Sequence, residues 1–495
     1  MPDENDLLDE FMEHRDPDNP NPFKKYTDGV TLNTEQAIAV SEAMFLIEET
    51  PPRTDEHFLV SGLAGTGKTV TLIELVRALL EAGYKPAVCA PTGKAAHVIT
   101  GKAKGLFHAR TLHSVLTENP LDHIKEINAQ ITELRKAIHR GQMPKDEAER
   151  RIEELEVLSS KFERKNSMSF SPIDPEDFHT MFDCIVCDEA SMVGKSTMMR
   201  PFMDPIKCVK FFFGDYGQLP PVQDEPAVDL SDPDVLLTEI HRQAADSGII
   251  KVAHHIRNRN EVGKEFFETH DDLTSGTETD MNEVLKYAED HQILVWKNAT
   301  RHSLNLPIRK ARGFDFMSLP PKDQMRPMVG EELMFDQNIK DRGIFKGMPF
   351  TVVAVEETED YEKRENRYLT KITLMLDNDI ELEGVINFSD LVPPNIRFHG
   401  SEKEDKFERI AASRMGINVM YPYALTVHKA QGSEWEKVCV IGEYPASMNE
   451  FKEWMYTAAT RAAKELVVLS KMYFKKPHKG RTIAERRAAR AALKG

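Results

Sequence analysis

The chemistry of this sequence is concentrated first in nine consecutive residues, Ser61 to Thr69, which read SGLAGTGKT. Glycines at this Gly-x-x-x-x-Gly-Lys-Thr spacing let backbone N–H groups turn inward at the positive end of a helix, where polyphosphate charge is stabilised. In such a loop Lys68 would reach the β- and γ-phosphates, and the Thr69 hydroxyl would complete a Mg²⁺ shell. The stretch therefore predicts a nucleoside triphosphate site. Its expected binding residues are Gly62, Ala64, Gly65, Thr66, Gly67, Lys68 and Thr69.

Two carboxylates and a glutamine follow later apolar runs of the chain. Asp188 and Glu189 come directly after one such run, and Gln218 follows the next. Asp188 would hold Mg²⁺ through water, so Thr69 and Asp188 are the expected metal ligands, while Glu189 would be the base that orients the attacking water. An Asp-Glu pair after a strand is common on its own, but together with a phosphate-binding loop it predicts triphosphate hydrolysis. Gln218 is placed to sense the γ-phosphate.

Three further polar residues are candidates for the same site. Gln36 opens a helical pattern for which Thr31, Asn33 and Thr34 are all possible N-caps, and its amide could read an adenine edge with one donor and one acceptor. Arg242 lies at the edge of a second unit of the chain. Arg461 is a second arginine that could face the phosphates across a cleft.

Apolar runs supply the elements that must position these residues. Residues 57–60 predict a strand before the loop, and the apolar spacing from 72 to 80 predicts a helix after it. A second strand, expected over 87–90, breaks into small and hydroxyl residues around Thr92 and Lys94, and this pattern suits a contact with a nucleic-acid backbone phosphate. His113 lies in a third such place.

Two stretches depart from the alternation of strands and helices. Over 121–165, isoleucines and leucines recur every three or four residues on both sides of a Gly and Pro break, which predicts two antiparallel helices that project from the globule. Extended stretches at 117–120 and 166–170 could pair at the base of this hairpin. Short alternating runs over 327–395 predict a small β-barrel or sheet inserted into the second domain.

Composition limits the class of protein. With 495 residues, 40% of them hydrophobic and 29% charged, the chain is typical of a soluble protein with two or more domains. No apolar run approaches the ~20 residues that span a bilayer, and the acidic N-terminus predicts no secretory leader. The net charge of −17 argues against a nucleic-acid partner only if it is taken as a whole, because charge sums describe long-range steering rather than the lining of one groove.

The five cysteines indicate a cytoplasmic protein. They lie mostly within apolar runs, as reduced thiols of the cytosol do. Cys184 and Cys187 have the C-x-x-C spacing, but they share one strand pattern and have no second pair, so core thiols are favoured over a zinc or redox site.

The motifs and their order resemble those of superfamily 1 helicases. The stretches that carry the resemblance are 62–69, Asp188-Glu189-Ala190-Ser191, Gly214-Asp215-x-x-Gln218-Leu219-Pro220, 426–432 (TVHKAQG) and Thr457-x-x-Thr460-Arg461. The string VHKAQGSE is similar to the RecD and phage Dda branch, whose members move 5′ to 3′ on single-stranded DNA. The resemblance covers about residues 31–470; the insertion at 121–165 and the charged tails are departures from it.

The resemblance implies an α/β fold with two RecA-like P-loop domains in tandem, a helical-hairpin insertion in the first and a small SH3-like β-barrel in the second. It implies a division into an acidic tail, a first RecA-like domain with an insertion at 115–172, a second RecA-like domain in two pieces around an inserted subdomain, and a basic tail. The expected bounds are 1–30, 31–235, 236–312 with 415–470, 313–414 and 471–495.

The resemblance also carries roles onto matching residues. Gln36 would contact adenine, Lys68, Thr69, Asp188, Glu189 and Gln218 would form one half of the ATP site, and Arg242 and Arg461 would complete it. Residues expected to touch DNA are Thr92, Lys94, His113, Pro220, Asn298, Thr426 and His428. A β-hairpin in the first domain would be the duplex-splitting pin, with Pro120 and Phe170 at its root.

The expected activity is therefore ATP- and Mg²⁺-dependent 5′-to-3′ DNA unwinding, by a monomer, on single-stranded and forked DNA. Single-strand-binding or replication proteins are the expected protein partners, and no membrane is expected. Two other activities remain open: an RNA-directed motor of the same superfamily, and a nucleic-acid switch that hydrolyses ATP without translocating. A generic P-loop kinase is excluded because it lacks a second domain with matching arginines.

Overall fold

The structure is a computed structural model, and it describes about two thirds of the chain. The described residues are 32–118, 131, 135, 150–152, 171–240, 247–258, 270–276, 281–319, 324–339, 344–355, 368–376, 380–392, 401–443 and 448–469. Apart from five positions, the predicted helical hairpin over 121–165 lies outside them. So do both charged tails and the candidate residues Pro120, Phe170 and Arg242.

The chain divides into two compact units. The first runs to Tyr216 and takes up the chain again at Pro220–Glu239, whereas the second contains Gly217–Leu219 and everything from Ile240 onward. Three residues of the strand-end motif around Gln218 are therefore grouped with the second unit, although the residues on both sides of them belong to the first.

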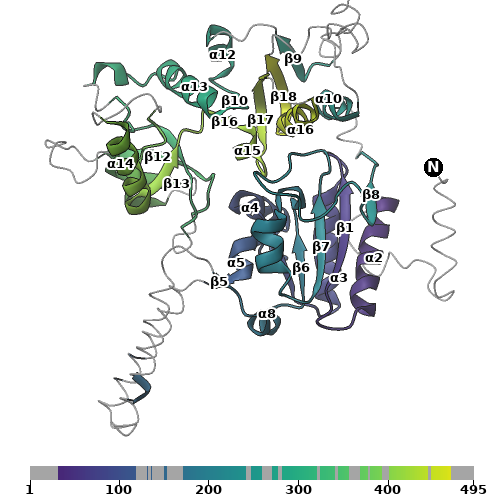
Figure 1. The fold of residues 1–495 in the computed structure, drawn as a ribbon. Coiled ribbons are helices and arrows are strands. Elements are labelled where there is room, and N and C mark those ends of the chain that lie inside the picture. Colours follow the sequence, from purple (N-terminus) through teal and green to yellow (C-terminus); the bar gives the residue numbers. More distant parts are fainter. Residues whose placement is uncertain are drawn as a thin grey trace, which may run out of the picture. The chain divides into compact units, whose positions relative to one another are not determined.

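The first unit is built on a six-stranded parallel sheet with the order β3-β2-β6-β7-β1-β8 (Figure 1). Its strands are β1 (Glu56–Gly62), β2 (Pro86–Ala90), β3 (Arg110–Thr111), β6 (Cys184–Cys187), β7 (Val209–Gly214) and β8 (Val235–Leu237). Because all of these strands run the same way, the loops that follow them lie at one edge of the sheet. This carboxyl edge is where the predicted chemistry lies.

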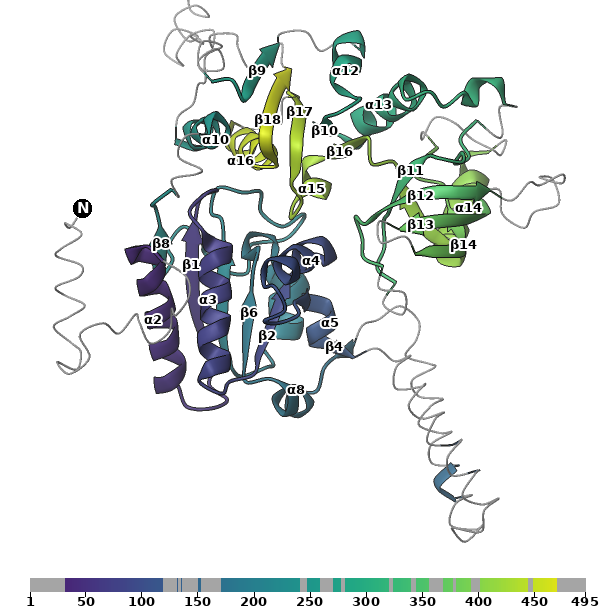
Figure 2. The ribbon, with the colours of Figure 1, turned by 180° about the vertical axis from the view of Figure 1, so that it is seen from behind.

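Helices cover both faces of this sheet, and the strand residues alternate between them. Phe211 and Phe213 belong to the core under α2 (Thr34–Glu49), α3 (Lys68–Glu81) and α4 (Gly93–Lys102). Phe212, between them, belongs to the opposite core, under α5 (Leu112–Leu116), α8 (Pro175–Met181) and the π-helical segment η3 (Lys195–Met203). Figure 2 shows α2 and α3 side by side over one face.

A short antiparallel pair lies at the base of the predicted insertion. β4 (Thr117–Glu118) pairs with β5 (Ser171–Pro172), so that Thr117 is opposite Pro172. The pairing was expected with residues 166–170, and the observed partner lies just beyond that stretch. The two ends of the insertion therefore leave the globule together.

The second unit contains a five-stranded parallel sheet with the order β16-β10-β17-β18-β9. Its elements are β9 (Leu273–Gly276), β10 (Gln292–Val295), β16 (Ala424–Thr426), β17 (Trp435–Ile441), β18 (Ala462–Leu469), α10 (Gly248–Asn258), α12 (Met281–Tyr287), α13 (Asn298–Ala311), α15 (Val427–Ala430) and α16 (Met448–Ala459). Helix α10 packs on α16 and β18, whereas α13 packs on α12, β10 and β16 (Figure 1).

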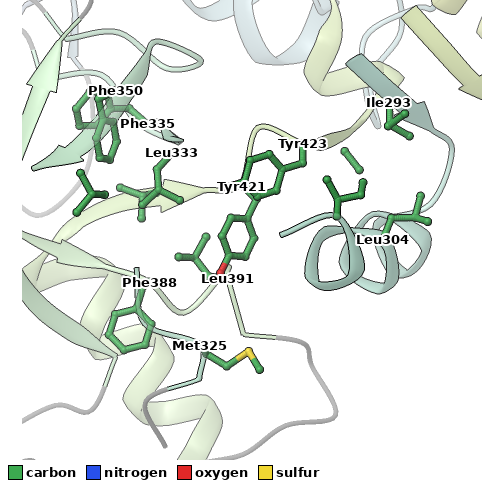
Figure 3. Packing of buried hydrophobic residues seen from close by; sticks show 14 of the residues in the cluster. Ile293, Leu304, Met325, Leu333, Phe335, Phe350, Phe388, Leu391, Tyr421 and Tyr423 are labelled. Atoms are coloured by element: carbon green, nitrogen blue, oxygen red, sulfur yellow. The ribbon is translucent and has the colours of Figure 1, made fainter. Parts of the chain in front are cut away.

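A closed five-stranded barrel interrupts the second unit. Its strands are β11 (Glu332–Phe335), β12 (Pro349–Val355), β13 (Leu369–Leu376), β14 (Glu381–Asn387) and β15 (Ile417–Met420), and α14 (Glu402–Met415) connects the last two. The barrel shares one hydrophobic core with the sheet beside it. Figure 3 shows this continuity: Tyr421 and Tyr423 stack on each other between Leu333 and Phe335 of the barrel and Ile293 of β10 and Leu304 of α13.

The predicted fold class is confirmed, namely two parallel RecA-like sheets and an inserted β-barrel. The three strands expected from alternation correspond to β12, β13 and β14. The first and last barrel strands, β11 and β15, and the helix α14 were not predicted. All five cysteines are free and buried, which confirms that they are core thiols. Among the described residues, no helix has the length and apolarity needed to cross a membrane.

Candidate nucleotide and nucleic-acid sites

The phosphate-binding loop connects β1 to α3 in the conformation that its glycines allow. Gly65 and Gly67 have φ angles of 86° and 85°, which residues with a Cβ rarely adopt. Gly62 is required for a different reason, because a Cβ there would lie 2.6 Å from Thr66 Oγ1 and 2.8 Å from the Leu237 carbonyl oxygen. The loop is therefore fitted closely against β8 on one side and opens α3 on the other.

The ammonium of Lys68 has three oxygen neighbours in the first unit. It donates to the carbonyls of Gly62 (2.7 Å) and Leu63 (3.0 Å), and it lies 3.5 Å from Asp215 Oδ2. Asp215 is fully buried and comes directly after β7, which pairs with β1. The carboxylate and the ammonium therefore follow adjacent strands of the sheet. Triphosphate binding at this loop must exchange some of these contacts for contacts with phosphate oxygens.

Asp188 and Glu189 follow β6 at the same edge. Burial is the main reason that the pKa of the Asp188 carboxyl is raised to about 7, and the negative charge of Glu189 contributes to the rise. The positive charge of Lys68 acts in the opposite direction. Glu189 has a φ angle of +53°, a conformation that residues other than glycine seldom adopt, and its N–H donates to Asp188 Oδ1 (2.9 Å). Such a strained backbone is typical of functional sites because surrounding structure must enforce it.

The residues present fit a Mg²⁺ ion of the kind that accompanies nucleotides. Among the described residues there is no cluster of three or more His, Cys, Asp or Glu side chains that could hold a metal alone. Mg²⁺ in nucleotide sites needs only one or two protein ligands, because phosphate oxygens and water supply the rest. Asp188 and the Thr69 hydroxyl are suitable for this role, and a nearby dication would favour the charged form of the Asp188 carboxylate.

Gln36 supports the phosphate-binding loop through a hydrogen bond to the backbone of Thr66. It is fully buried, its Nε2 donates to the Thr66 carbonyl (3.0 Å), and its Oε1 accepts from the Asn33 N–H (3.1 Å). Asn33 is the helix N-cap, and the two residues form a reciprocal capping box. The predicted contact of Gln36 with adenine stays a prediction.

Arg461 lies in the second unit and is almost fully buried. Its guanidinium donates to the carbonyls of Thr457 (3.0 Å) and Ser433 (3.1 Å) and to Thr460 Oγ1 (3.1 Å). Ser433 and Arg461 precede the parallel strands β17 and β18, so the arginine lies at the amino edge of that sheet. Its role toward ATP is not tested by these contacts.

The backbone of Leu219 is held within the second unit by two motif residues. Its N–H donates to Thr457 Oγ1 (3.0 Å), and its carbonyl accepts from Gln431 Nε2 (3.1 Å). We call this arrangement the Leu219 clamp. All three residues are buried, and the adjacent Gln218 has a buried Oε1 with no hydrogen-bond partner among the described residues.

The nucleic-acid candidates of the first unit follow the paired strands β2 and β3. Thr92 caps α4, and Lys94 lies in the first turn of that helix. His113 is exposed on α5. These three residues lie at the same edge of the sheet as the phosphate-binding loop but nearer its β3 end. Pro220 is also exposed in this unit.

The candidates of the second unit form an equivalent group at the carboxyl edge of its sheet. Strands β10 and β16 pair with Val295 opposite Thr426, so Asn298 and His428, which follow them, lie near each other. Asn298 is exposed at the start of α13, Thr426 is buried, and His428 is partly buried. Burial lowers the pKa of His428, so its ring is neutral at pH 7.

Sequence reasoning missed Asp215 and Trp296. Asp215 was part of the quoted motif, and its position directly after a parallel strand could have marked it, since such strand ends converge. Trp296 ends an apolar run in the sequence, and it lies just past β10 against His428. Only the side-chain packing reveals that contact.

Comparison with protein families finds two matches. An AAA domain matches residues 31–278, half of the chain, and a UvrD-like helicase C-terminal domain matches residues 421–469. The first match contains the loop, Asp188 and Asp215, and the second contains Thr426, His428 and Arg461.

Similar proteins include two curated relatives. The ATP-dependent RecD2 DNA helicase of Deinococcus radiodurans is 24% identical over 446 residues, which cover 87% of this chain and 50% of the relative. An uncharacterised protein of Methanocaldococcus jannaschii, MJ1519, is 23% identical over 475 residues, 83% of this chain and 36% of that protein. The chain thus spans a third to a half of the length of these relatives.

Solved structures of similar fold include Bacteroides Pif1 bound to single-stranded DNA. That structure has 18% sequence identity and a TM-score of 0.48, with 94% of this chain and 98% of that chain covered. The two family matches account for both sheets and for the motifs on them. The chain therefore belongs to the AAA-domain family and, with a UvrD-like helicase C-terminal domain behind that module, has the organisation of a superfamily 1 helicase.

Proposed function

We propose that this protein is an ATP-dependent DNA helicase that moves 5′ to 3′ on single-stranded DNA and unwinds duplexes ahead of it. The direction rests on the VHKAQGSE string and its likeness to the RecD branch. The similar protein from Deinococcus radiodurans is named a RecD2 DNA helicase, which supports the proposed activity. A phage origin rests only on the likeness of the motifs to Dda.

The observation that carries the proposal is the convergence of three strand ends in the first unit. The loop after β1, Asp188 after β6 and Asp215 after β7 lie at one edge of one parallel sheet. The loop amides and Lys68 would hold the triphosphate, and Glu189 would orient the attacking water. Bound Mg²⁺ would neutralise charge that develops on the phosphates. We assign Gln218, Arg242 and Arg461 to completion of this site.

ATP hydrolysis would be coupled to DNA through the polar residues that follow β2 and β3 in the first unit and β10 and β16 in the second. Thr92, Lys94 and His113 in the first unit and Asn298 and His428 in the second are polar groups at carboxyl edges. ATP binding would then favour a closed arrangement of the two units, and hydrolysis would favour an open one. Each change would move the DNA contacts of one unit along the strand relative to those of the other. An arginine that completes such a site contributes about 10³ to 10⁵ in rate, which makes hydrolysis depend on closure.

The test is strand displacement on duplexes with a single-stranded tail at either the 5′ or the 3′ end, in DNA and in RNA. We expect ATP-dependent unwinding of the 5′-tailed DNA and little of the others. Preference for the RNA substrates would indicate an RNA-directed motor. DNA-stimulated ATP hydrolysis without displacement of any substrate would indicate a switch. Lys68→Ala serves as the control for contaminating activity and should be inactive on every substrate.

A further inference from the structure

A tryptophan at the carboxyl edge of the second sheet has no role in the function described so far. Trp296 is the first residue after β10 and is partly exposed. Its neighbours Lys297 and Asn298 are exposed. Since β10 pairs with β16, Trp296 lies beside α15, the short helix that carries His428. The ring is therefore at the edge where DNA contacts are expected in this unit.

Aromatic neighbours fix the indole ring in place. Its centroid lies 5.7 Å from the His428 ring at an interplanar angle of 60°, and 5.7 Å from the Trp454 ring in an edge-to-face arrangement (77°). Trp454 is fully buried on α16, and Phe451 lies behind it with a ring separation of 6.2 Å. A ring held in this way loses little conformational freedom when a ligand stacks on it.

The backbone beside the ring is also fixed, and this limits what can bind there. The N–H groups of Trp296 and Lys297 each donate to Glu443 Oε2 at 2.8 Å, and the Thr300 hydroxyl donates to Glu443 Oε1. The Glu443 carboxylate thus occupies the two amides just before α13 and places a negative charge beside the ring, which disfavours a phosphate there. His428, neutral at pH 7, adds no positive charge.

The partly exposed indole ring is therefore the group at this edge that a base could use, with the exposed Lys297 and Asn298 beside it. Aromatic side chains bind single-stranded nucleic acid by stacking on bases, and the stacking tolerates any sequence because every base has a π-face. We propose that Trp296, braced by His428 and Trp454, stacks on a base of the single strand that crosses the second unit. This inference rests on the proposed function, because it requires that the protein bind DNA.

Intrinsic fluorescence gives a direct test, since the 495-residue sequence has three tryptophans, at positions 296, 435 and 454. Titration with oligo(dT) without nucleotide should quench the wild-type emission. Trp296→Phe should abolish most of the quenching while anisotropy of labelled oligo(dT) shows binding within about threefold of wild type, because phenylalanine still stacks. Trp296→Ala should weaken binding about 5- to 150-fold. Trp435→Phe, at the opposite edge of the sheet, should keep both the quenching and the affinity.

Two negative outcomes are distinguishable. If wild type and Trp296→Ala bind oligo(dT) equally, or if the quenching survives in Trp296→Phe, Trp296 only fills space between α15 and α16 and the inference is wrong. If the wild-type protein itself shows no anisotropy change with oligo(dT), the proposed function fails and the inference fails with it.

Discussion

The Lys68 ammonium lies 3.5 Å from the Asp215 carboxylate, and the two residues come from loops after the adjacent parallel strands β1 and β7. Asp215 is fully buried, and the Lys68 ammonium is a favourable neighbour for its carboxylate. The same ammonium must stabilise phosphate oxygens if the loop binds ATP. Together with the Gly62 and Leu63 carbonyls, Asp215 helps to position the lysine, and triphosphate binding has to compete with it for the same cation.

This competition predicts opposite effects on ATP binding for the two partners. Lys68→Ala removes the cation and should weaken ATP binding and lower kcat by about 100- to 1,000-fold. Asp215→Asn removes only a negative charge near the triphosphate, so ATP should bind at least as tightly as in wild type. The lysine would then be less well placed, and kcat should fall by about 10- to 100-fold. Equilibrium binding of a fluorescent ATP analogue and steady-state ATPase rates separate the two effects. Weakened binding in Asp215→Asn would contradict the competition.

The loop glycines provide a matched pair of substitutions. Gly62→Ala would place a Cβ 2.6 Å from Thr66 Oγ1 and 2.8 Å from the Leu237 carbonyl, which forces the loop away from β8. We expect a loss of about 1–3 kcal/mol in the free energy of unfolding. Gly101, inside α4, has no atom within 4 Å of an added Cβ, so Gly101→Ala should be neutral or stabilise by up to about 1 kcal/mol. Urea unfolding measures both. Equal effects of the two substitutions would show that the close approach at Gly62 is unimportant.

Local patterns predicted the first unit well because its chemistry lies in consecutive residues. Glycines that need unusual φ angles and apolar runs that end in acids mark strand ends directly, as at Gly67 and Asp188. In the barrel, β11 and β15 are four residues each and pair with each other although they lie far apart in the chain, so no local alternation marks them.

Contacts between distant side chains could not be predicted either. The ring of Trp296 meets His428, and the backbone of Leu219 meets Thr457, more than a hundred residues away in each case. Such pairs depend on strand order, and strand order is a property of the whole sheet. The role of Gln36 as a brace for the loop was missed for the same reason, since its partner Thr66 lies in another element.

A buried ion pair joins the barrel to the second sheet. Arg309 on α13 and Glu331, next to β11, are both fully buried, with Nε and Oε1 2.7 Å apart. Arg309 also donates to the Gln324 and Arg326 carbonyls, so removal of one partner leaves a charge without compensation. Glu331→Gln should lower the free energy of unfolding by about 3–5 kcal/mol.

The neighbouring residue offers the control for this ion pair. Glu332 lies 3.8 Å from Arg312 with about half of its side chain exposed, and Glu332→Gln should change stability by less than about 1 kcal/mol. Thermal or urea unfolding of the two variants makes the comparison. If they are equally stable, the buried pair contributes no more than a surface pair does.

The Leu219 clamp predicts that loss of the Thr457 hydroxyl impairs the stimulation of ATP hydrolysis by DNA. Thr457→Val removes the acceptor for the Leu219 N–H, and Thr457→Ser keeps it. A buried amide without a partner costs about 1–3 kcal/mol, so the segment around Gln218 should shift in the valine variant. We expect the DNA-stimulated ATPase rate to fall about 10-fold or more in Thr457→Val, while Thr457→Ser behaves as wild type. If the serine variant is equally impaired, the methyl group rather than the hydroxyl is what matters.

Stability should depend on pH through a partly buried histidine, His302. Burial, and next the charge of Arg301, lower the pKa of His302 below its ordinary value of about 6.5. The unfolded chain then binds the proton more readily, so the stability that neutral His302 contributes is present above about pH 6.5 and is lost as the pH falls through the folded-state pKa.

Two buried carboxyls oppose this effect, because the raised pKa values of Asp188 and Glu331 stabilise the folded state as the pH falls. The contribution of His302 is therefore isolated by comparing the wild type with a variant that lacks this histidine. Urea unfolding at pH 7.5, 6.5 and 5.5 should show wild type losing stability relative to His302→Gln as the pH falls. A constant difference between the two proteins would show that His302 titrates alike in the folded and unfolded chains.

The central claim is that ATP hydrolysis at the Lys68 loop drives movement along single-stranded DNA toward its 3′ end. Release of streptavidin from biotinylated oligonucleotides measures this movement without any duplex. We predict ATP-dependent release from a 3′-biotin, little from a 5′-biotin, and none with Lys68→Ala. Release from the 5′ end instead, or DNA-stimulated hydrolysis with no release from either end, would contradict the account.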